Sequence, residues 1–467
     1  MRSTLTRGTV VASLAILAAA PALAGGFQVR QQGAKASGRG GAFVAQADDA
    51  SATFFNPAAA GHLDGWNFYL GGGLQEPDVS FDAAAGGSAD MQDSTLYAKQ
   101  IYFTGPIGDH YAFAFGAFNP FALRTHWFAG DPVEHSALKS VWNTQELNLS
   151  IIAKLNEKIS VAIGFENVRM VIEDFSQAYD TTPLAPFLFP GEPATEPQQN
   201  ITLAANKAGV NLAVHYVGDT GYRFGLSFRS QKIMRADGWL KWSNVEEGPF
   251  FIPSANLVDD SGCLTAGTPI PDPNPTEPPI TTYCPLGAAF TDSKASGTFV
   301  LPATIDVGLG RAGQGKWDWE VDLLWSKWVK FDSIDVIVDS PNGVGSGFAV
   351  KPTTTSLTRK ENWKSTLGVA GGADYHFSDR HTARFGLIYD PSAIPEKQAR
   401  PYLQDGDKIG LTGGYGWQGI DGHVSADVYA QYWIYGDRET PGGPPYVVPG
   451  TYSTSAFALG GSVQFHF

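Results

Sequence analysis

Apolar and polar residues alternate with a period of two along most of this chain. At the C-terminal end, one parity carries Phe457, Leu459, Val463, Phe465 and Phe467, whereas the other carries small or polar residues. Successive side chains of a β-strand point to opposite faces, so this segment is predicted to be a strand with one apolar and one polar face. Because the same pattern recurs along the chain, the sequence predicts an all-β protein.

The alternating segments number about fourteen, an even count like that of bacterial single-chain barrels. They lie at residues 66–82, 94–105, 110–119, 143–155, 158–173, 205–217, 220–242, 293–311, 314–331, 359–377, 380–390, 406–418, 421–436 and 452–467. The gaps between them are short turns and long loops in turn, and the longest loop runs from 243 to 292. This arrangement predicts an antiparallel transmembrane β-barrel whose termini both lie on the periplasmic, short-turn side.

Alternation alone does not decide which face is inside. In the segment 317–325, large apolar residues alternate with Asp318, Glu320 and Asp322. A soluble β-sandwich would place these carboxylates outside, whereas a barrel in lipid places them in its lumen. The charged fraction of only 17% and the aromatic fraction of 12% favour the barrel. The net charge of −14 argues against a nucleic-acid-binding protein, which needs a basic face.

The first 24 residues have the features of a secretory signal peptide. Arg2 and Arg7 form a basic start, an apolar stretch follows from 10 to 20, and residues 22–24 read Ala-Leu-Ala, a cleavage motif. A membrane anchor is the alternative, but the apolar stretch is shorter than the roughly 20 residues that span a bilayer. The chain is therefore expected to be exported to the outer membrane of a Gram-negative bacterium.

Residues 25–65, which we call the hatch, precede the first strand and do not alternate. A non-strand segment inside a lipid-embedded barrel is expected to fold into the lumen, because irregular backbone is not stable against lipid. Within it, Pro57 pushes Asn56 toward an extended conformation, so Asn56, Pro57 and Ala58 are predicted to form a fixed bend. The expected organisation is a signal peptide at 1–24, a hatch at 25–65 that plugs the lumen, and a barrel at 66–467.

Several motifs together resemble the FadL/TodX-type transporters of hydrophobic compounds. They are Gly26-Phe27-Gln28, Gly40-Gly41-Ala42-Phe43, Ala47-Asp48-Asp49-Ala50-Ser51, Asn56-Pro57-Ala58, Asn119-Pro120-Phe121-Ala122-Leu123 and Pro395-Glu396-Lys397-Gln398-Ala399-Arg400. The resemblance implies uptake of hydrophobic small molecules, either long-chain fatty acids or hydrocarbons, through a hatch-gated barrel with an exit in its wall. It also implies roles for individual residues: Phe27 and Arg400 contact the substrate, Asn56, Pro57 and Ala58 anchor the hatch, and Gly116 and Asn119 mark the kinked strand beside the wall opening.

The expected partners are the hydrophobic ligand, the lipids of the outer membrane and the outer-membrane assembly machinery. The machinery is expected to read Phe467, which ends an alternating aromatic strand. We expect a monomer without cofactor or metal. Cys263 and Cys284 lie in the longest loop, and in an oxidising compartment they are expected to form a disulfide; two free thiols or a metal pair remain the alternatives.

Enzymatic motifs carry little weight here, and no catalytic residue is assigned. Residues 308–313 match G-x-G-x-x-G but lead into a turn and another strand, not into the helix that a dinucleotide site requires. No G-x-S-x-G motif supports a lipid hydrolase. His376 is expected to be solvated rather than metal-bound. A general diffusion porin remains the alternative function, although the hatch argues against an open lumen.

Inward-facing cations have two interpretations. Arg223 and Arg229 share the polar parity of their segment. Such a cation could hold the carboxylate head group of a ligand through charge-assisted hydrogen bonds. Alternatively, these are ordinary lumen charges paired with Glu166 or Asp374, since barrel interiors are normally polar.

Overall fold

The protein is described by a computed structural model of the whole chain. It describes residues 26–92, 94–178, 197–244, 251–253, 264–270, 280–285, 292–328, 331, 333–340, 353–403, 405–419, 421–442 and 447–467. The predicted signal peptide and Cys263 lie outside these residues, as does the side chain of Cys284, so the disulfide stays a prediction.

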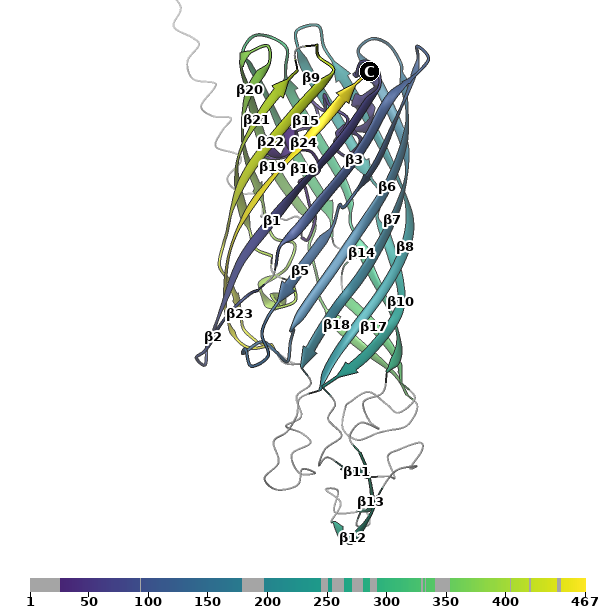
Figure 1. The fold of residues 1–467 in the computed structure, drawn as a ribbon, viewed down its shortest axis with the longest axis vertical. Coiled ribbons are helices and arrows are strands. Elements are labelled where there is room, and N and C mark those ends of the chain that lie inside the picture. Colours follow the sequence, from purple (N-terminus) through teal and green to yellow (C-terminus); the bar gives the residue numbers. More distant parts are fainter. Residues whose placement is uncertain are drawn as a thin grey trace, which may run out of the picture.

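Fourteen antiparallel strands form a closed barrel (Figure 1). Five of them are interrupted once, so the wall consists of these segments: β1 Asn67–Ala83, β3 Leu96–Ile107, β4 Tyr111–Phe118 with β5 Ala122–His126, β6 Lys139–Lys154, β7 Ile159–Ala178, β8 Gln198–Val217, β9 Tyr222–Arg229 with β10 Lys232–Ser243, β14 Ser293–Leu301 with β15 Ala303–Arg311, β16 Trp317–Lys327 with β17 Ser333–Ser340, β18 Thr353–Lys360 with β19 Thr366–Ser378, β20 His381–Asp390, β21 Lys408–Gln418, β22 Val424–Tyr435 and β24 Gly450–His466. The first and last strands close the barrel, with Asn67 opposite His466 and Ala83 opposite Gly450.

The two ends of the barrel differ. Short turns join the strands at the end where the C-terminus lies, which we call the short-turn end (Figure 1). The opposite, long-loop end carries the small strands β2 Ser88–Asp90 and β23 Arg438–Thr440, and beyond the wall β11 Phe251–Pro253, β12 Leu264–Ile270 and β13 Ile280–Pro285. This arrangement agrees with the alternation of short and long gaps in the sequence.

Proline explains where one predicted strand breaks. The segment 293–311 is predicted as one strand, but it is divided into β14 and β15 at Pro302. Proline has no backbone N–H for a strand ladder. The predicted strand 314–331 is also shorter than expected: β16 ends at Lys327, and Trp328 is buried inside.

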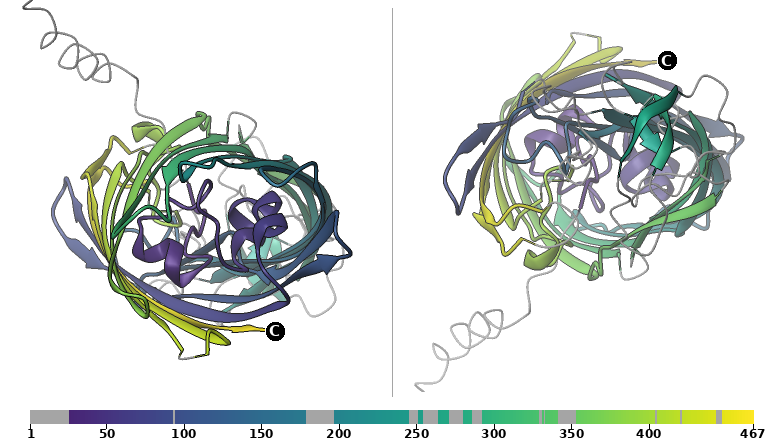
Figure 2. Two further views of the ribbon diagram at one scale, coloured as in Figure 1. Left: turned by 90° about the horizontal axis from the view of Figure 1, so that it is seen from above. Right: turned by 90° about the horizontal axis from the view of Figure 1, so that it is seen from below.

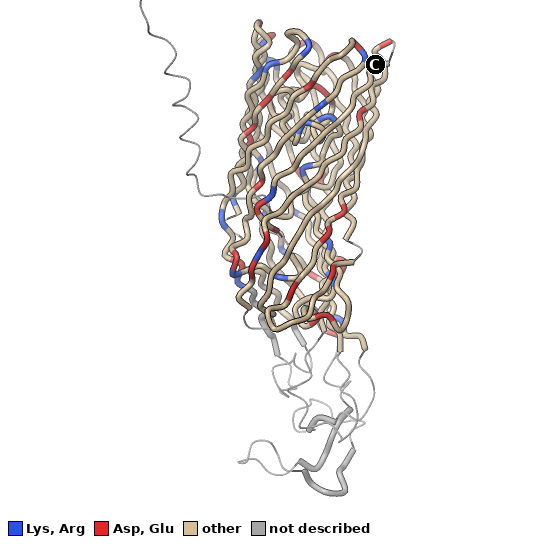
Figure 3. The backbone as a smooth tube through the Cα atoms, turned by 90° about the vertical axis from the view of Figure 1, so that its left-hand side faces the viewer, with Lys and Arg blue, Asp and Glu red and all other residues tan. Residues whose placement is uncertain are grey.

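The faces of the wall settle the question that alternation left open. On β16, Trp319, Val321 and Leu323 are 39–47% exposed, whereas Glu320 and Asp322 are 1% and 0% exposed. Large apolar side chains therefore face outward and carboxylates face the lumen, which is the arrangement of a barrel in lipid and the opposite of a soluble sandwich. Figure 3 shows that charged residues are sparse along the barrel wall.

The hatch fills the lumen, in the half of the barrel nearer the short-turn end (Figures 1 and 2). It contains two short α-helices, α1 Ala34–Gly38 and α2 Ala52–Phe55, followed by a 3-10 helix, η2 Pro57–His62. Nearly all of its side chains are buried. No helix in the described part of the chain is long and apolar enough to cross a bilayer. The hatch thus packs inside the barrel, as predicted.

Glycine lets the hatch approach the wall at Gly225 on β9. A Cβ atom there would overlap the carbonyl oxygen of Val44 and lie 2.8 Å from the side-chain nitrogen of Asn56. We expect Gly225→Val to displace the hatch while the barrel still assembles. Entry of a small hydrophilic dye into whole cells should rise, at an unchanged level of heat-modifiable barrel. Gly371→Val on β19 is the matched control, because nothing lies within 4 Å of a Cβ there. Equal permeability of the two variants would contradict a tightly docked hatch.

Candidate functional site: the wall break and the hatch that closes it

The barrel wall is interrupted at residues 119–121, which we call the wall break. β4 is paired with β3 as far as Ala117 and with β6 as far as Phe118. From Ala122 onward, β5 is paired only with β6 among the described strands. The part of β3 beyond the break, Leu96–Gln100, is paired only with β1 among the described strands. Pro120 has no N–H to offer to a ladder, so the strand cannot continue through this point without a gap.

Gly116 does not form the kink that the sequence interpretation assigns to it. It lies in a regularly paired stretch, with partners on both β3 and β6. A Cβ at this position would lie 2.9–3.0 Å from the side chains of Tyr102 and Phe118 of the wall and of Thr53 of the hatch, so the glycine makes room for the packing of wall and hatch side chains. Asn119 does lie in the break, where its side chain donates to the carbonyl of Thr144 at 2.6 Å.

The N-terminal end of the hatch fills the wall break. We call residues 26–32 the N-terminal segment. The N–H of Val29 donates to the carbonyl of Pro120 at 2.9 Å, and the N–H of Ala122 donates to the carbonyl of Phe27 at 3.2 Å. The segment therefore adds a short stretch of strand to the interrupted edge. The side chain of Val29 packs against Ala98 and Ala122, behind the part of β3 that lacks a second neighbour.

Phe27 anchors this segment in a cluster of aromatic rings. Its ring centroid lies 5.4–6.1 Å from those of Phe121, Trp142, Trp328 and Trp363, mostly in edge-to-face geometry. Such ring pairs contribute about 0.5–1.5 kcal/mol each beyond the burial of their surface. The sequence singled out Phe27 but could not predict these ring contacts, because strands distant in the chain bring the rings together.

A cavity of about 90 Å³ lies between the N-terminal segment and the wall. Phe27, Val29, Leu96 and Leu123 give it an apolar side. Its other side holds charges that are already paired, since the Nζ of Lys408 lies 2.7 Å from Asp405 and 3.3 Å from Asp390. The arrangement suits a hydrophobic molecule beside a neutralised polar patch.

Arg400 lies away from this cavity. It is half-buried in the segment after the short 3-10 helix η6 Glu396–Gln398, where it forms a β-bridge with Leu403. Leu403 lines the cavity, whereas Arg400 does not. Phe27 therefore lines the cavity, whereas Arg400 only neighbours a residue that lines it, Leu403.

The rest of the hatch is held by carboxylates of the wall. Asp322 accepts hydrogen bonds from the N–H groups of Phe43 and Val44 at 2.8 and 3.1 Å. Glu320 accepts from those of Ala45 and Gln46 at 2.5 and 2.9 Å. Four successive backbone donors of the hatch therefore meet two inward-facing carboxylates of β16. We call this contact the carboxylate cradle.

A buried arginine of the hatch completes the cradle. Arg39 is fully buried, with its guanidinium 2.9 Å from Asp374 and 3.4 Å from Glu320. Its Nε also donates to the carbonyl of Ala42 at 3.1 Å. Charge-assisted hydrogen bonds of this kind are about twice as strong as neutral ones.

Arg229 holds a second part of the hatch from β9, two strands away from β16 in the wall. It pairs with Glu146 at 2.5 Å and Glu166 at 2.7 Å, and it donates to the carbonyl of Phe54 at the end of α2 at 3.0 Å. Of the two interpretations from the sequence, pairing with Glu166 is confirmed. Because its guanidinium faces α2 and two carboxylates, it contributes to docking of the hatch.

The Asn56-Pro57-Ala58 bend ties the hatch to β8. The Asn56 side chain donates to the carbonyls of Val44 and Val214 at 2.9 and 3.1 Å, and it accepts from the N–H of Ala58 at 3.2 Å. Asn56 is the N-cap of η2, and Pro57 occupies the first helical position, where a missing N–H is harmless. The predicted bend is present, and its asparagine joins two hatch segments to the wall.

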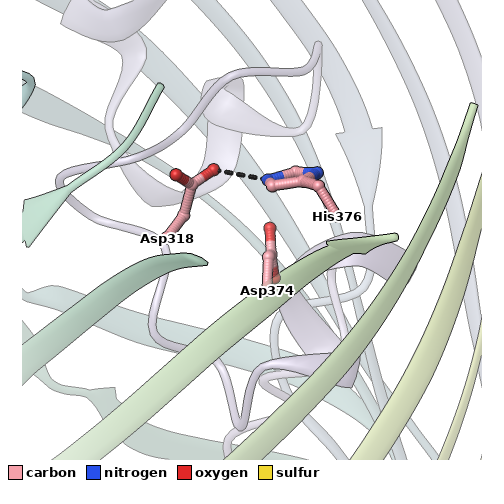
Figure 4. Close-up of side chains that lie close together, drawn as sticks. All are labelled: Asp318, Asp374 and His376. Carbon is pink, nitrogen blue, oxygen red and sulfur yellow. Dashed lines mark hydrogen bonds and ion pairs between the residues drawn. The ribbon is translucent and has the colours of Figure 1, made fainter. Parts of the chain in front are cut away.

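Asp318, Asp374 and His376 lie close together at the short-turn end (Figure 4). His376 Nε2 lies 2.7 Å from Asp318, and the three possible ligand atoms lie within 4.8 Å of one another. Asp374 is already paired with Arg39 of the hatch. A guanidinium at this distance disfavours a bound cation, so Asp374 belongs to the hatch contacts and the trio gives no support for a metal centre.

Known proteins share this architecture. Residues 15–461 match the model of the family described as outer membrane protein transport protein (OMPP1/FadL/TodX). The long-chain fatty acid transport protein of Escherichia coli K12 is 23% identical over 444 residues, which cover 92% of each chain. Among solved structures, a Pseudomonas aeruginosa FadL homologue superposes with a TM-score of 0.75 at 17% identity, covering 95% of this chain and 100% of its own. The Pseudomonas putida toluene transporter TodX gives 0.67 at 14% identity, covering 93% and 98%.

A barrel with an apolar outer face, a lumen filled by its own N-terminus and an interrupted wall defines a plugged outer-membrane transporter. The chain belongs to the OMPP1/FadL/TodX family. It is therefore an outer-membrane transporter of hydrophobic compounds in a Gram-negative bacterium, and its family is not enzymatic. The family, the fold class and the location predicted from the sequence are confirmed.

Two adjacent carboxylates of the hatch respond to burial in opposite ways. Burial, with the like charge of Asp48, raises the pKa of Asp49 to about 6, although Lys35 and Ser51 oppose the rise. Burial also acts to raise the pKa of Asp48, but Lys35 at 2.7 Å and Arg223 outweigh it and hold that pKa well below its usual value. Asp49 therefore stays protonated in the docked hatch at pH values where it would ionise in the free hatch.

Docking should accordingly weaken as the pH rises from about 4 to 6, since the ionised form of Asp49 is favoured only in the free hatch. We expect Asp49→Asn to remove this dependence and to strengthen docking at pH 7. Asp48→Asn should weaken docking at pH 7, because it removes the ion pair with Lys35. Hydrogen-exchange protection of hatch amides, corrected for intrinsic rates, measures both. Identical profiles in wild type and Asp49→Asn would contradict the assignment.

Proposed function

We propose that this transporter collects hydrophobic molecules at its long-loop end, holds them in the cavity beside Phe27 and releases them sideways through the wall break. The observation that carries the proposal is the unequal fastening of the hatch. The body of the hatch is held by the carboxylate cradle, Arg229 and Asn56. The N-terminal segment is instead held across the break mostly by neutral contacts, which are backbone hydrogen bonds, the packing of Phe27 and Val29, and the side chain of Gln31; its one ion pair, between Arg30 and Asp306, is long at 3.9 Å. The segment is therefore the part that moves.

Sideways release follows from the nature of the cargo. A direct route to the short-turn end passes through the buried ionic contacts of the hatch body and then into water, where an apolar molecule is disfavoured. The wall break opens instead between β3 and β5, toward the lipid. Hydrophobic molecules gain free energy from entering lipid, by roughly 0.8 kcal/mol per buried CH₂ group.

The cargo is a long-chain fatty acid or a hydrocarbon, since the relatives include a long-chain fatty acid transport protein and a toluene transporter. Phe27 contacts it directly in this proposal, and Arg400 acts from behind Leu403. We further propose that residues 1–24 are removed on export, that Phe467 serves barrel assembly, that a Cys263–Cys284 disulfide closes the longest loop, and that the protein works as a monomer in outer-membrane lipid with its short-turn end toward the periplasm.

A reversible lock tests whether the N-terminal segment opens the wall. Val29 packs against Ala98 of β3, so Val29→Cys with Ala98→Cys, in a chain with Cys263→Ser and Cys284→Ser, should join the segment to the wall on oxidation. Uptake of a labelled hydrophobic compound should then be lost and should return on reduction. Each single-cysteine variant is the matched control and should transport under both conditions. Equal uptake by the oxidised and reduced double-cysteine protein would exclude the wall break as the exit.

A second test concerns the Asn56 bend. Replacing Asn56 and Pro57 together by alanine leaves the carbonyls of Val44 and Val214 without their donor and frees η2 from β8. Removing one such cap costs about 1 kcal/mol, which a closed barrel tolerates. We expect normal barrel levels and abolished uptake, because the displaced hatch no longer presents the N-terminal segment to the break. Normal uptake at an equal surface level would show that the bend has no part in gating.

A further inference from the structure

Four glutamine side chains meet behind the wall break. Gln31 of the N-terminal segment donates through its Nε2 to the Oε1 of Gln431 on β22 at 3.0 Å and to the Oε1 of Gln75 on β1 at 3.3 Å. Gln100 on β3 donates to the backbone carbonyl of Gln31. Gln31, Gln100 and Gln431 are all buried. We call the four the amide group.

The hydrogen-bond partners fix which amide atoms are acceptors. The indole Nε1 of Trp433, which can only donate, lies 3.2 Å from the Oε1 of Gln431. The Nε2 of Gln431 lies 2.8 Å from the carbonyl of Ser37, which can only accept. The orientation of Gln431 follows, so Gln31 must present its NH₂ group to it. The same NH₂ group then makes the nearby oxygen of Gln75 an acceptor.

The amide group forms part of the partition between two spaces. The cavity beside Phe27 and a smaller one of about 10 Å³ against β1 and β3 share four lining residues: Val29, Gln31, Gln75 and Leu96. Two of these four belong to the N-terminal segment. Movement of that segment therefore joins the two spaces and at the same time removes Gln31 from its partners.

Removal of Gln31 leaves the oxygen of the half-buried Gln75 without that donor, whereas the oxygen of Gln431 keeps the indole N–H of Trp433 at 3.2 Å. Another acceptor without a donor is already present, since the Oε1 of Gln28 is buried without a hydrogen-bond partner among the described residues and Gln28 lines the cavity. An unpartnered buried acceptor is costly, and a ligand that supplies a donor relieves this cost. A carboxylate would bring a negative charge close to these oxygens and supply no donor, and a pure hydrocarbon would leave them unpaired.

Two cations that line the cavity face carboxylates that compensate their charge. Lys408 is paired with Asp390 and Asp405, and Arg30, whose Nε is buried without a hydrogen-bond partner among the described residues, faces Asp306 at 3.9 Å. The hydrogen bonds of the amide group described above involve no charged side chain. Ionic recognition of a head group is therefore weak at this point of the route.

On these grounds, and resting on the sideways release proposed above, we infer that the exit selects cargo with an uncharged, hydrogen-bond-donating head. Long-chain alcohols, alkylphenols and protonated fatty acids belong to this class. Their O–H group donates to the oxygen of Gln75, in place of the NH₂ group of Gln31, while the segment is displaced. The apolar tail meanwhile lies along Val29 and Leu96, toward the break.

The test compares three labelled probes of equal chain length: 1-dodecanol, which donates a hydrogen bond; 1-methoxydodecane, which only accepts one; and dodecane, which does neither. Uptake is measured as the excess over cells that lack the protein. We expect wild type to carry dodecanol at least about fivefold faster than the other two, which is the effect of one hydrogen bond. The ratio of rates within one strain is independent of the amount of barrel.

Gln75→Leu should lower the ratio of the dodecanol uptake rate to the dodecane uptake rate toward one. The matched control is Gln145→Leu, an exposed glutamine on the outward parity of β6, and it should keep the wild-type ratio. Equal rates for dodecanol and methoxydodecane in wild type would overturn the inference, even if Gln75→Leu failed to assemble. An unchanged ratio in assembled Gln75→Leu would also overturn it. Failure to carry any of the three would count against the proposed transport route itself.

Discussion

The buried charges of the lumen constrain the whole molecule. Glu320, Asp322 and Arg229 are nearly or fully buried and face inward from the wall. A buried charge without hydrogen-bond partners is strongly disfavoured, and so is a buried backbone N–H without an acceptor. The hatch has α-helices of only five and four residues, and the irregular stretch between them leaves the N–H groups of four consecutive residues, Phe43 to Gln46, to be bonded by the wall. Wall and hatch therefore satisfy each other's hydrogen bonds: wall carboxylates accept from hatch N–H groups, and Arg229 donates to hatch carbonyls.

This mutual dependence divides the hatch into two parts. The body is bound through charge-assisted hydrogen bonds, and breaking one partner of such a contact leaves the other charge buried and unpaired. The N-terminal segment is bound mainly through neutral hydrogen bonds of its backbone and of Gln31, each contributing about 0.5–1.5 kcal/mol net, and through ring contacts of Phe27, with one long ion pair between Arg30 and Asp306 at 3.9 Å. The difference in kind means that the two parts can respond separately. A small displacement at residues 26–32 does not require the body to leave the lumen.

The alternation of side chains was sufficient to predict a barrel of about fourteen strands, but not where the strands break and end, since β5, β17 and most of β18 lie outside the predicted segments. It placed Glu320 and Asp322 on one face, and the low charged fraction favoured the lumen for that face. It could not predict their partners, since Phe43 to Gln46 carry no distinguishing side chains and contribute only backbone donors. Gly116 was misassigned for a similar reason. A glycine inside a strand indicates either a bulge or a close approach, and only the position of Thr53 decides between them.

The sequence is limited in the same way at the wall break, because it does not show which residues are close in space. Pro120 marks an interruption of the strand in the sequence, but an interrupted strand at the edge of a gap normally leaves unpaired backbone groups, which lipid does not tolerate. The chain supplies the missing partners from its own N-terminus, at Phe27 and Val29. A gap closed by a separate strand-like segment can open without unfolding the barrel, whereas a gap closed by the wall itself cannot. The role of Pro120 is therefore evident only together with the hatch, and the amide group behind it determines which cargo the opened gap accommodates.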